Sequence, residues 1–195
     1  MDMQGTRQLA VNQQQAWDAL NNPEVLKVCI PGCDRIDLGE DHQFLIGMAV
    51  KVGPVSAKFT GKISLLDMTP PASYTLNFEG QGGVAGFGKG TAQVKLIPND
   101  QGCELQYIVN AQVGGKIAQL GQRLIDGAAK SLSEDFFKKF ELETAKIFST
   151  SQDAASGLLE PQGVDQANAS PAGWLSTRNV SLAALALIVL YFVLR

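Results

Sequence analysis

Histidine and cysteine are scarce in this chain of 195 residues, which contains one histidine and three cysteines. A single histidine, His42, cannot supply a histidine-rich metal site and leaves one candidate for a histidine base. Three cysteines cannot complete a disulfide framework, so we expect a reducing, cytosolic compartment. Basic residues have no surplus, because 16 lysines and arginines stand against 19 aspartates and glutamates. We therefore expect no nucleic-acid partner, since such partners need cations to neutralise phosphates.

Charge is missing from residues 180–194, VSLAALALIVLYFVL, which precede the terminal Arg195. The stretch is apolar on all sides, unlike an amphipathic helix that buries one face. As a helix it would span about 22 Å, which is short of the roughly 30 Å of a bilayer core. Trp174 and Arg178 suit positions at the membrane interface. We predict a membrane anchor over 174–195, and the alternative is a helix docked in a protein groove.

Composition divides the chain into three parts. Residues 1–148 mix alternating apolar and polar positions with charges of both signs, which is typical of a folded domain. Residues 149–173 are rich in Ser, Ala, Gly, Gln and Pro and contain no basic residue, so they predict a flexible linker. Residues 174–195 are the anchor segment. Asp2 and Arg7 lie in an alternating pattern without an apolar run, so no secretory signal peptide is expected.

Alternating apolar residues predict antiparallel strands. The clearest run covers 55–65, where odd positions are apolar or glycine and even positions are polar. Gly53 and Pro54 separate it from a similar run at 44–52, as in a hairpin. Further strands are predicted at the N-terminus and over 74–78, 92–96 and 103–113.

Helical signals bracket these strands. Asn12 is a good N-cap for a helix over 13–20, and Pro23 opens a second short helix through Val28. A long helix is predicted from 116 to about 148. Its apolar residues recur at three- and four-residue steps: Ile117, Leu120, Leu124, Ala128, Leu132, Phe136 and Phe140.

The predicted fold class is α+β, with a curved antiparallel sheet wrapped around a long C-terminal helix and two short helices after the first strand. An apolar cavity is expected between the sheet and that helix. This order resembles the helix-grip fold of the START/polyketide-cyclase (SRPBCC) superfamily. Within it, the sequence resembles the CoxG family of carbon monoxide dehydrogenase subunits. The resemblance rests on WDALNNPEVLKVCIPGC at 17–33, KVGPVSAKFTGKI at 51–63, GGVAGFGKGTAQV at 82–94 and AQVGGKIAQLGQRLIDGAAK at 111–130.

The resemblance implies a bacterial, non-catalytic accessory protein of a molybdenum hydroxylase such as carbon monoxide dehydrogenase. It also implies a hydrophobic ligand cavity, C-terminal attachment to the cytoplasmic face of the cell membrane, and a link to respiratory quinone. A quinone or another lipid-like ligand would be bound without a covalent bond. Two alternatives remain open: a membrane adaptor with a closed core, and a cyclase or hydrolase that uses Tyr107 or His42 as an acid–base group.

The predicted ligand site faces the space between the sheet and the long helix. Apolar and aromatic side chains suit a lipid-like molecule or a quinone headgroup, and Tyr107 adds one hydroxyl. The expected lining residues are Met48, Val50, Phe59, Phe78, Tyr107, Leu120 and Leu124, with Phe87 above them as a movable lid. The alternative is that these residues form ordinary core, and that Phe87 only anchors a flexible loop.

Three other motifs lack the context that their chemistry needs. Residues 80–85 match a dinucleotide fingerprint, but the following residues predict a strand instead of the required helix. Cys29 and Cys33 lack a second ligand pair for zinc, so we expect a packing residue and a turn residue. His42 lies in a predicted surface turn without a recognisable nucleophile. No catalytic or metal-ligating residue is therefore predicted.

Overall fold

The computed structural model describes residues 2–40 and 42–155 as a seven-stranded sheet with three α-helices. In chain order the elements are β1 (Asp2–Leu9), α1 (Gln13–Leu20), α2 (Pro23–Cys29), β2 (Cys33–Leu38), β3 (Gln43–Val52), β4 (Val55–Thr69), β5 (Ser73–Gln81), β6 (Phe87–Asn99), β7 (Gly102–Gly114) and α3 (Gln122–Ala155). The strand order is β1-β7-β6-β5-β4-β3-β2, and every neighbouring pair is antiparallel. The predicted α+β meander is confirmed.

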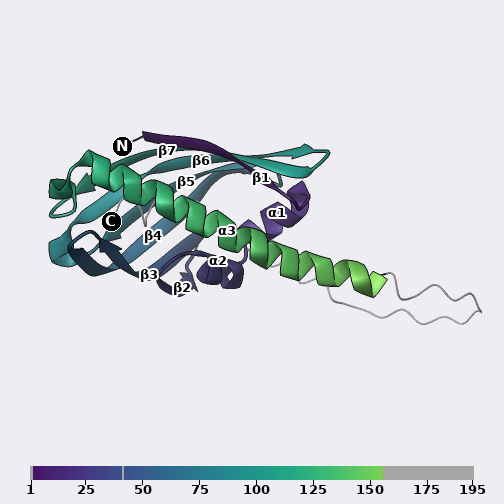
Figure 1. The fold of residues 1–195 in the computed structure, drawn as a ribbon, viewed down its shortest axis with the longest axis horizontal. Coiled ribbons are helices and arrows are strands. Elements are labelled where there is room, and N and C mark those ends of the chain that lie inside the picture. The colour runs from purple at the N-terminus through teal and green to yellow at the C-terminus, as the bar shows by residue number, and fades with distance from the viewer. Residues whose placement is uncertain (1, 41, 156–195) are drawn as a thin grey trace, which may run out of the picture.

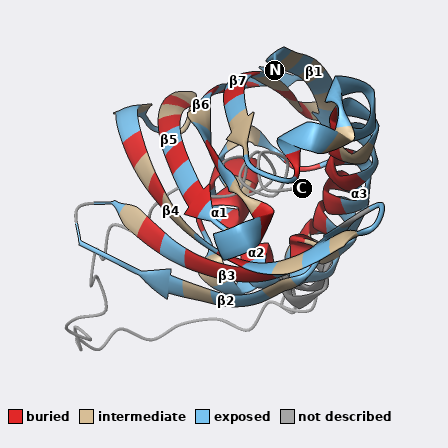
Figure 2. Ribbon diagram, turned by 90° about the vertical axis from the view of Figure 1, so that its left-hand side faces the viewer, coloured by how far each residue is buried: buried red, intermediate tan, exposed pale blue. Residues whose placement is uncertain are grey.

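Helix α3 lies across one face of the curved sheet (Figure 1), and the buried residues of both elements face each other (Figure 2). In β5 the buried residues are Tyr74, Leu76, Phe78 and Gly80, in strict alternation with more exposed ones. Side chains of a strand point alternately to its two faces, so one face of the sheet joins the core and the other meets solvent.

The two short helices begin where the sequence predicts. At the start of α1, the backbone N–H of Gln15 donates to the Asn12 side chain at 2.9 Å. The Asn12 N–H donates in turn to the Gln15 side chain at 3.1 Å, which completes a capping box. Pro23 occupies the first turn of α2, where its missing N–H costs no helical hydrogen bond. Trp17 and Leu20 bury the inner face of α1 in the core.

Strand β2 is the element that the sequence does not predict. Cys33, expected in a turn, is its first residue and pairs with Met48 of β3. The Cys33 N–H donates to the Ile30 carbonyl oxygen at 3.3 Å, so Cys33 closes the expected turn and also begins the strand. The strand itself was not predicted because β2 is an edge strand with little apolar alternation. Of its residues, Ile36 is half-buried and Leu38 is exposed, so the strand is formed by pairing with β3 and not by a buried face of its own.

Helix α3 begins later and ends later than predicted. A short 3-10 turn (Ala118–Leu120) precedes it, and Gly121 separates the two with a φ of 88°. The helix continues to Ala155, past the predicted domain boundary at 148. The remainder of the predicted linker and the predicted anchor lie outside the described residues. Within residues 2–40 and 42–155, no helix combines the length and the hydropathy needed to cross a bilayer.

Candidate ligand site between the sheet and helix α3

Three of the predicted lining residues lie deep on the inner face of the sheet. Met48, Phe59 and Phe78 are almost completely buried and belong to one continuous core cluster. Two phenylalanines of α3 complete this region, Phe136 and Phe140, whose rings stack with centroids 5.6 Å apart. The sheet and the helix are therefore joined by closely packed apolar side chains in this part of the interior.

Tyr107 places the one predicted hydroxyl at the edge of this core. Its ring stacks against Phe137 of α3 with centroids 6.0 Å apart. Its hydroxyl lies 3.5 Å from the Oγ atom of Ser133, at the limit of a hydrogen bond. Gly5 of β1 makes room for this hydroxyl, because a Cβ atom at Gly5 would lie 2.5 Å from the Tyr107 oxygen. Three elements thus meet at one pair of hydroxyl groups.

A hollow of about 340 Å³ opens beside this pair, between β1 and α3. Its wall includes the apolar Met3 and Ala129 together with Tyr107 and Ser133. Charged residues form its rim: Asp2, Asp126, Lys130 and Glu134. The arrangement offers two hydroxyl donors beside an aromatic ring, which suits a ligand with a carbonyl or hydroxyl on a flat apolar body.

Of the remaining predicted lining residues, Leu120 packs against the edge of the core cluster, whereas Leu124 and Phe87 do not join this interior. Leu120 is half-buried in the 3-10 turn, and Leu124 is 56% exposed. Phe87 is 49% exposed, and its ring covers Gly114 at the outer face of the sheet. The structure therefore places Leu124 and Phe87 away from the packed core. Val50 lies in β3, and its side chain is outside the described set.

Sequence reasoning missed Ser133, Ala129 and Gly5. Ser133 is only 5% exposed, so a polar residue is buried on the inner face of α3. A serine within the apolar stripe of a long helix is a signal that could have been read, because buried hydroxyl groups need partners. The contribution of Gly5 carries no such signal, since it depends on the pairing of β1 with β7.

The cysteine thiols are held in their protonated form. Burial raises the pKa of Cys29 to about 12 and that of Cys33 to about 11. Burial likewise raises the pKa of Cys103. A thiol with a raised pKa is a poor nucleophile and a poor metal ligand at neutral pH. In residues 2–40 and 42–155, no group of His, Cys, Asp and Glu is arranged to hold a metal ion.

Tyr74 carries a second buried hydroxyl, on β5. Its ring meets Trp17 edge-on with centroids 6.0 Å apart, and burial strongly raises the pKa of its hydroxyl. No described residue forms a hydrogen bond with this oxygen. The group does not line the β1–α3 hollow. Tyr74 therefore serves as a control for Tyr107, because it is a buried tyrosine that does not line the hollow.

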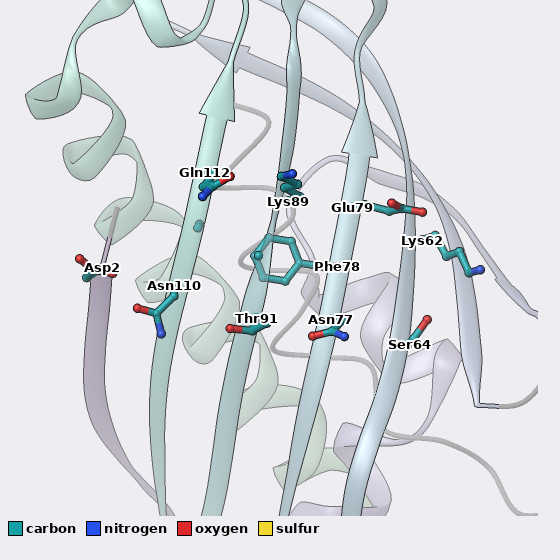
Figure 3. A pocket seen from close by; sticks show the side chains of 12 residues that line it. Asp2, Lys62, Ser64, Asn77, Phe78, Glu79, Lys89, Thr91, Asn110 and Gln112 are labelled. Carbon is teal, nitrogen blue, oxygen red and sulfur yellow. The ribbon is translucent and has the colours of Figure 1, made fainter.

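The outer face of the sheet carries a wide polar depression of about 790 Å³, which Figure 3 shows with the helices behind the strands. Register aligns its side chains in two rows that cross β4, β5, β6 and β7. One row contains Lys62, Glu79, Lys89 and Gln112, and the other contains Ser64, Asn77, Thr91 and Asn110. This surface offers hydrogen bonds and charges, in contrast with the apolar inner face.

The glycine-rich segment after β5 forms a turn of a hairpin. Gly83–Ala85 make a single 3-10 turn, and β6 follows directly from Phe87. No α-helix begins there, so this segment does not supply the helix N-terminus that a dinucleotide fingerprint needs. Gly83 has a φ of 59°, a conformation that glycine adopts without strain.

A comparison with protein families adds to this geometry. Residues 5–145 match the sequence profile of CoxG, a family described as a subunit of carbon monoxide dehydrogenase. The chain belongs to this family. The match spans β1 to most of α3, so the CoxG assignment covers the described domain and the β1–α3 hollow. A comparison with curated proteins gave no significant match.

Solved structures place this CoxG-family chain in the helix-grip fold. A conserved protein from Geobacillus kaustophilus is 35% identical, with a TM-score of 0.71, and the alignment covers 75% of this chain and 96% of that one. The aromatase/cyclase Zhui from Streptomyces sp. R1128 is 12% identical, with a TM-score of 0.53 and coverage of 82% and 99%. A protein from Thermus thermophilus is 12% identical, with a TM-score of 0.58 and coverage of 76% and 99%. The two distant likenesses show the fold alone.

Proposed function

We propose that this CoxG-family protein is a non-catalytic accessory protein that binds a respiratory quinone between the sheet and α3. It holds a molybdenum-containing oxidoreductase of the carbon monoxide dehydrogenase type at the cytoplasmic face of the membrane. Residues 180–194 attach it to the bilayer, because they are uncharged and apolar on all sides. Family membership supports the partner, and the β1–α3 hollow supports the ligand.

The observation that carries ligand binding is the pairing of Tyr107 with Ser133 beside the apolar Met3 and Ala129. A quinone presents a flat ring and two carbonyl oxygens that accept hydrogen bonds. The hydroxyl groups of Tyr107 and Ser133 lie 3.5 Å apart at the hollow, so both can donate to the same carbonyl oxygen, which has two lone pairs. The stacked rings of Tyr107 and Phe137 lie next to this pair and suit a flat ligand.

Calorimetric titration of the full-length protein with a short-chain ubiquinone tests this proposal. Tyr107→Phe and Ser133→Ala each remove one donor and are expected to weaken binding about three- to tenfold. Tyr74→Phe is the matched control, because it removes a hydroxyl that does not line the hollow. Wild-type affinity in both hollow variants, or an equal loss in the control, would contradict the proposed site.

A membrane adaptor with a closed core is the second candidate. It is favoured by the complete burial of Met48 and Phe59 in the cluster that includes Phe136. The two functions differ in one measurement, electron transfer from the oxidoreductase to quinone on vesicles that carry the Tyr107→Phe/Ser133→Ala double variant. Both functions predict that the variant still recruits the enzyme. Only a quinone carrier predicts that the variant loses electron transfer.

A further inference from the structure

Two segments that are distant in sequence are joined at one end of the domain. They are the turn between β5 and β6 and the segment that leads from β7 into α3. The backbone N–H of Ile117 donates to the carbonyl oxygen of Ala85 at 3.1 Å, which ties the segments together. Figure 2 looks onto this end, which lies opposite the turn between β6 and β7 (Figure 1).

The charges of these two segments are of one sign. Residues 82–89 and 114–124 contain Lys89, Lys116 and Arg123 and no acidic residue. All three side chains are exposed. Glu79 lies in register with Lys89, and Asp126 lies one helical turn after Arg123, so each acidic residue offsets part of its neighbour's charge. Neither segment contains an acidic residue beside Lys116, which therefore contributes most to the positive potential.

The turns at the opposite end of the sheet carry acidic residues instead of basic ones. Glu40 and Asp100 lie in the turns that follow β2 and β6, and Asp67 lies near the end of β4, where no lysine or arginine accompanies them. Consecutive turns of an antiparallel meander alternate between the two ends, so these acidic residues share one end, away from Lys116 and Arg123. The turns at the two ends of the sheet therefore differ in charge, although the net charge of the whole chain is only −3.

Large apolar side chains are exposed among the cations. Val84 at the tip of the β5–β6 turn is 85% exposed, and Phe87 and Leu124 are also exposed. We call the surface formed by Val84, Phe87, Lys89, Lys116, Arg123 and Leu124 the basic end. Exposed apolar groups flanked by lysine and arginine are the pattern with which peripheral proteins enter the headgroup region of acidic bilayers.

We propose that the basic end contacts the surface of an anionic lipid bilayer. The inference deepens the membrane part of the proposed function but requires neither residues 180–194 nor a bound quinone. An acidic protein would match Lys116 and Arg123, but it would not account for the apolar Val84 at the outermost point of the turn. A hollow of about 490 Å³, lined in part by Phe87 and Ile125, opens at the same end and would then face the lipid.

Co-sedimentation of the full-length chain with two kinds of vesicle tests the proposal. One kind contains phosphatidylcholine alone, and the other also contains phosphatidylglycerol. Wild-type protein is expected to bind the anionic vesicles more tightly, with a preference that falls as salt is added. Lys116→Gln and Arg123→Gln should each reduce this preference about fivefold. The control Lys138→Gln/Lys139→Gln removes two exposed charges from the middle of α3 and should leave the preference unchanged.

A second pair of variants tests the apolar contribution. Leu124→Ser is expected to weaken binding to anionic vesicles, whereas Leu142→Ser, a similarly exposed position further along α3, is not. Equal binding to the two kinds of vesicle, or equal effects of the basic-end and control variants, overturns the inference. Binding to phosphatidylcholine vesicles that Leu124→Ser leaves unchanged reports on residues 180–194. A chain that binds only anionic vesicles therefore contradicts the tail anchor and supports the basic end.

Discussion

The ring of Phe59 on β4 lies where a side chain on Gly82 would begin, so the β5–β6 turn closes directly onto an aromatic ring of the core. We predict that Gly82→Ala destabilises the protein by about 1–3 kcal/mol, because the added methyl group overlaps that ring. Urea unfolding measures the effect. Gly127→Ala is the control, since a Cβ atom there meets no neighbouring atom. The control should raise the free energy of unfolding by about 0.5–1 kcal/mol, because alanine favours a helix.

Arg7 fastens the edge strand β1 to α3. Its side chain pairs with Glu134 at 2.8 Å and with Glu141 at 3.3 Å, and its guanidinium carbon lies 5.3 Å from the centre of the Phe137 ring. Both carboxylates are about half exposed, so each ion pair contributes modestly. Arg7→Gln is expected to lower the free energy of unfolding by about 1–2 kcal/mol in urea denaturation.

Arg35 is the matched control for Arg7. It forms one ion pair, with Asp37 at 3.0 Å, and both partners are mostly exposed. Arg35→Gln should change the free energy of unfolding by about 0.5 kcal/mol or less. Similar losses in the two variants would show that Arg7 acts only as another surface charge.

The raised pKa values of the cysteines predict slow thiol chemistry in the folded protein. At pH 8, a thiol with the ordinary pKa of 9.0 is about one-tenth thiolate, whereas Cys33, with a pKa of about 11, is about one-thousandth thiolate. We therefore expect folded Cys33 to react with Ellman's reagent at least about a hundredfold more slowly than the urea-unfolded chain. Equal rates would show that the thiol is not held protonated.

The same pKa values set the pH dependence of stability. Between pH 9 and about 11, the unfolded chain loses the Cys33 proton while the folded protein keeps it. The folded state then binds more protons, so the free energy of unfolding falls as the pH rises through this range. In Cys33→Ala this decline should be shallower, and unfolding midpoints measured across the range provide the check. An identical decline in the variant would assign the loss to other groups.

Gly5 offers a test of the ligand site that leaves both hydroxyl groups in the chain. A Cβ atom at Gly5 would lie 2.5 Å from the Tyr107 oxygen, so Gly5→Ala must displace that hydroxyl from its place beside Ser133. We expect Gly5→Ala to weaken ubiquinone binding as much as Tyr107→Phe does. In the double variant Gly5→Ala/Tyr107→Phe no hydroxyl is left to displace, although the Cβ atom would still lie 2.6 Å from the ring carbon Cζ. The double variant should therefore lose less affinity than the sum of the two single losses. Additive losses in calorimetric titration would contradict this coupling.

The order of the helices and of every strand except β2 was predictable, because each of these elements depends on local sequence signals. The N-cap at Asn12 is confirmed, and so is the hairpin at Gly53 and Pro54, which joins β3 to β4. Strand β2 was not predictable from its own residues, because an edge strand needs no buried face. The family resemblance predicted how these elements are arranged in space, namely as a helix-grip fold. The solved relatives confirm this arrangement.

Which face of α3 is buried was harder to predict than the presence of the helix. The buried stripe contains Ile125 and Ala129, whereas the sequence pattern selects Leu124 and Ala128. Successive four-residue steps advance about 40° beyond a full turn, so a chain of such steps drifts around the helix. Counted back from Phe136, the predicted stripe leaves the buried face within a few turns. The same drift explains why Ser133 was overlooked and Leu124 was placed in the ligand site.

The pairing of β1 with β7 gives the domain an unusual order of assembly. Asp2 lies opposite Asn110, so the first strand of the domain is adjacent to the last strand of the sheet. During translation β1 must remain unpaired until β7 has left the ribosome, while the hairpins between them form from near neighbours. Leu9 is its one fully buried large residue, and the exposed Gln4, Thr6 and Gln8 alternate with half-buried neighbours. An unpaired strand of this composition has little tendency to aggregate while the rest of the domain is synthesised. Its late docking beside α3 completes the β1–α3 hollow.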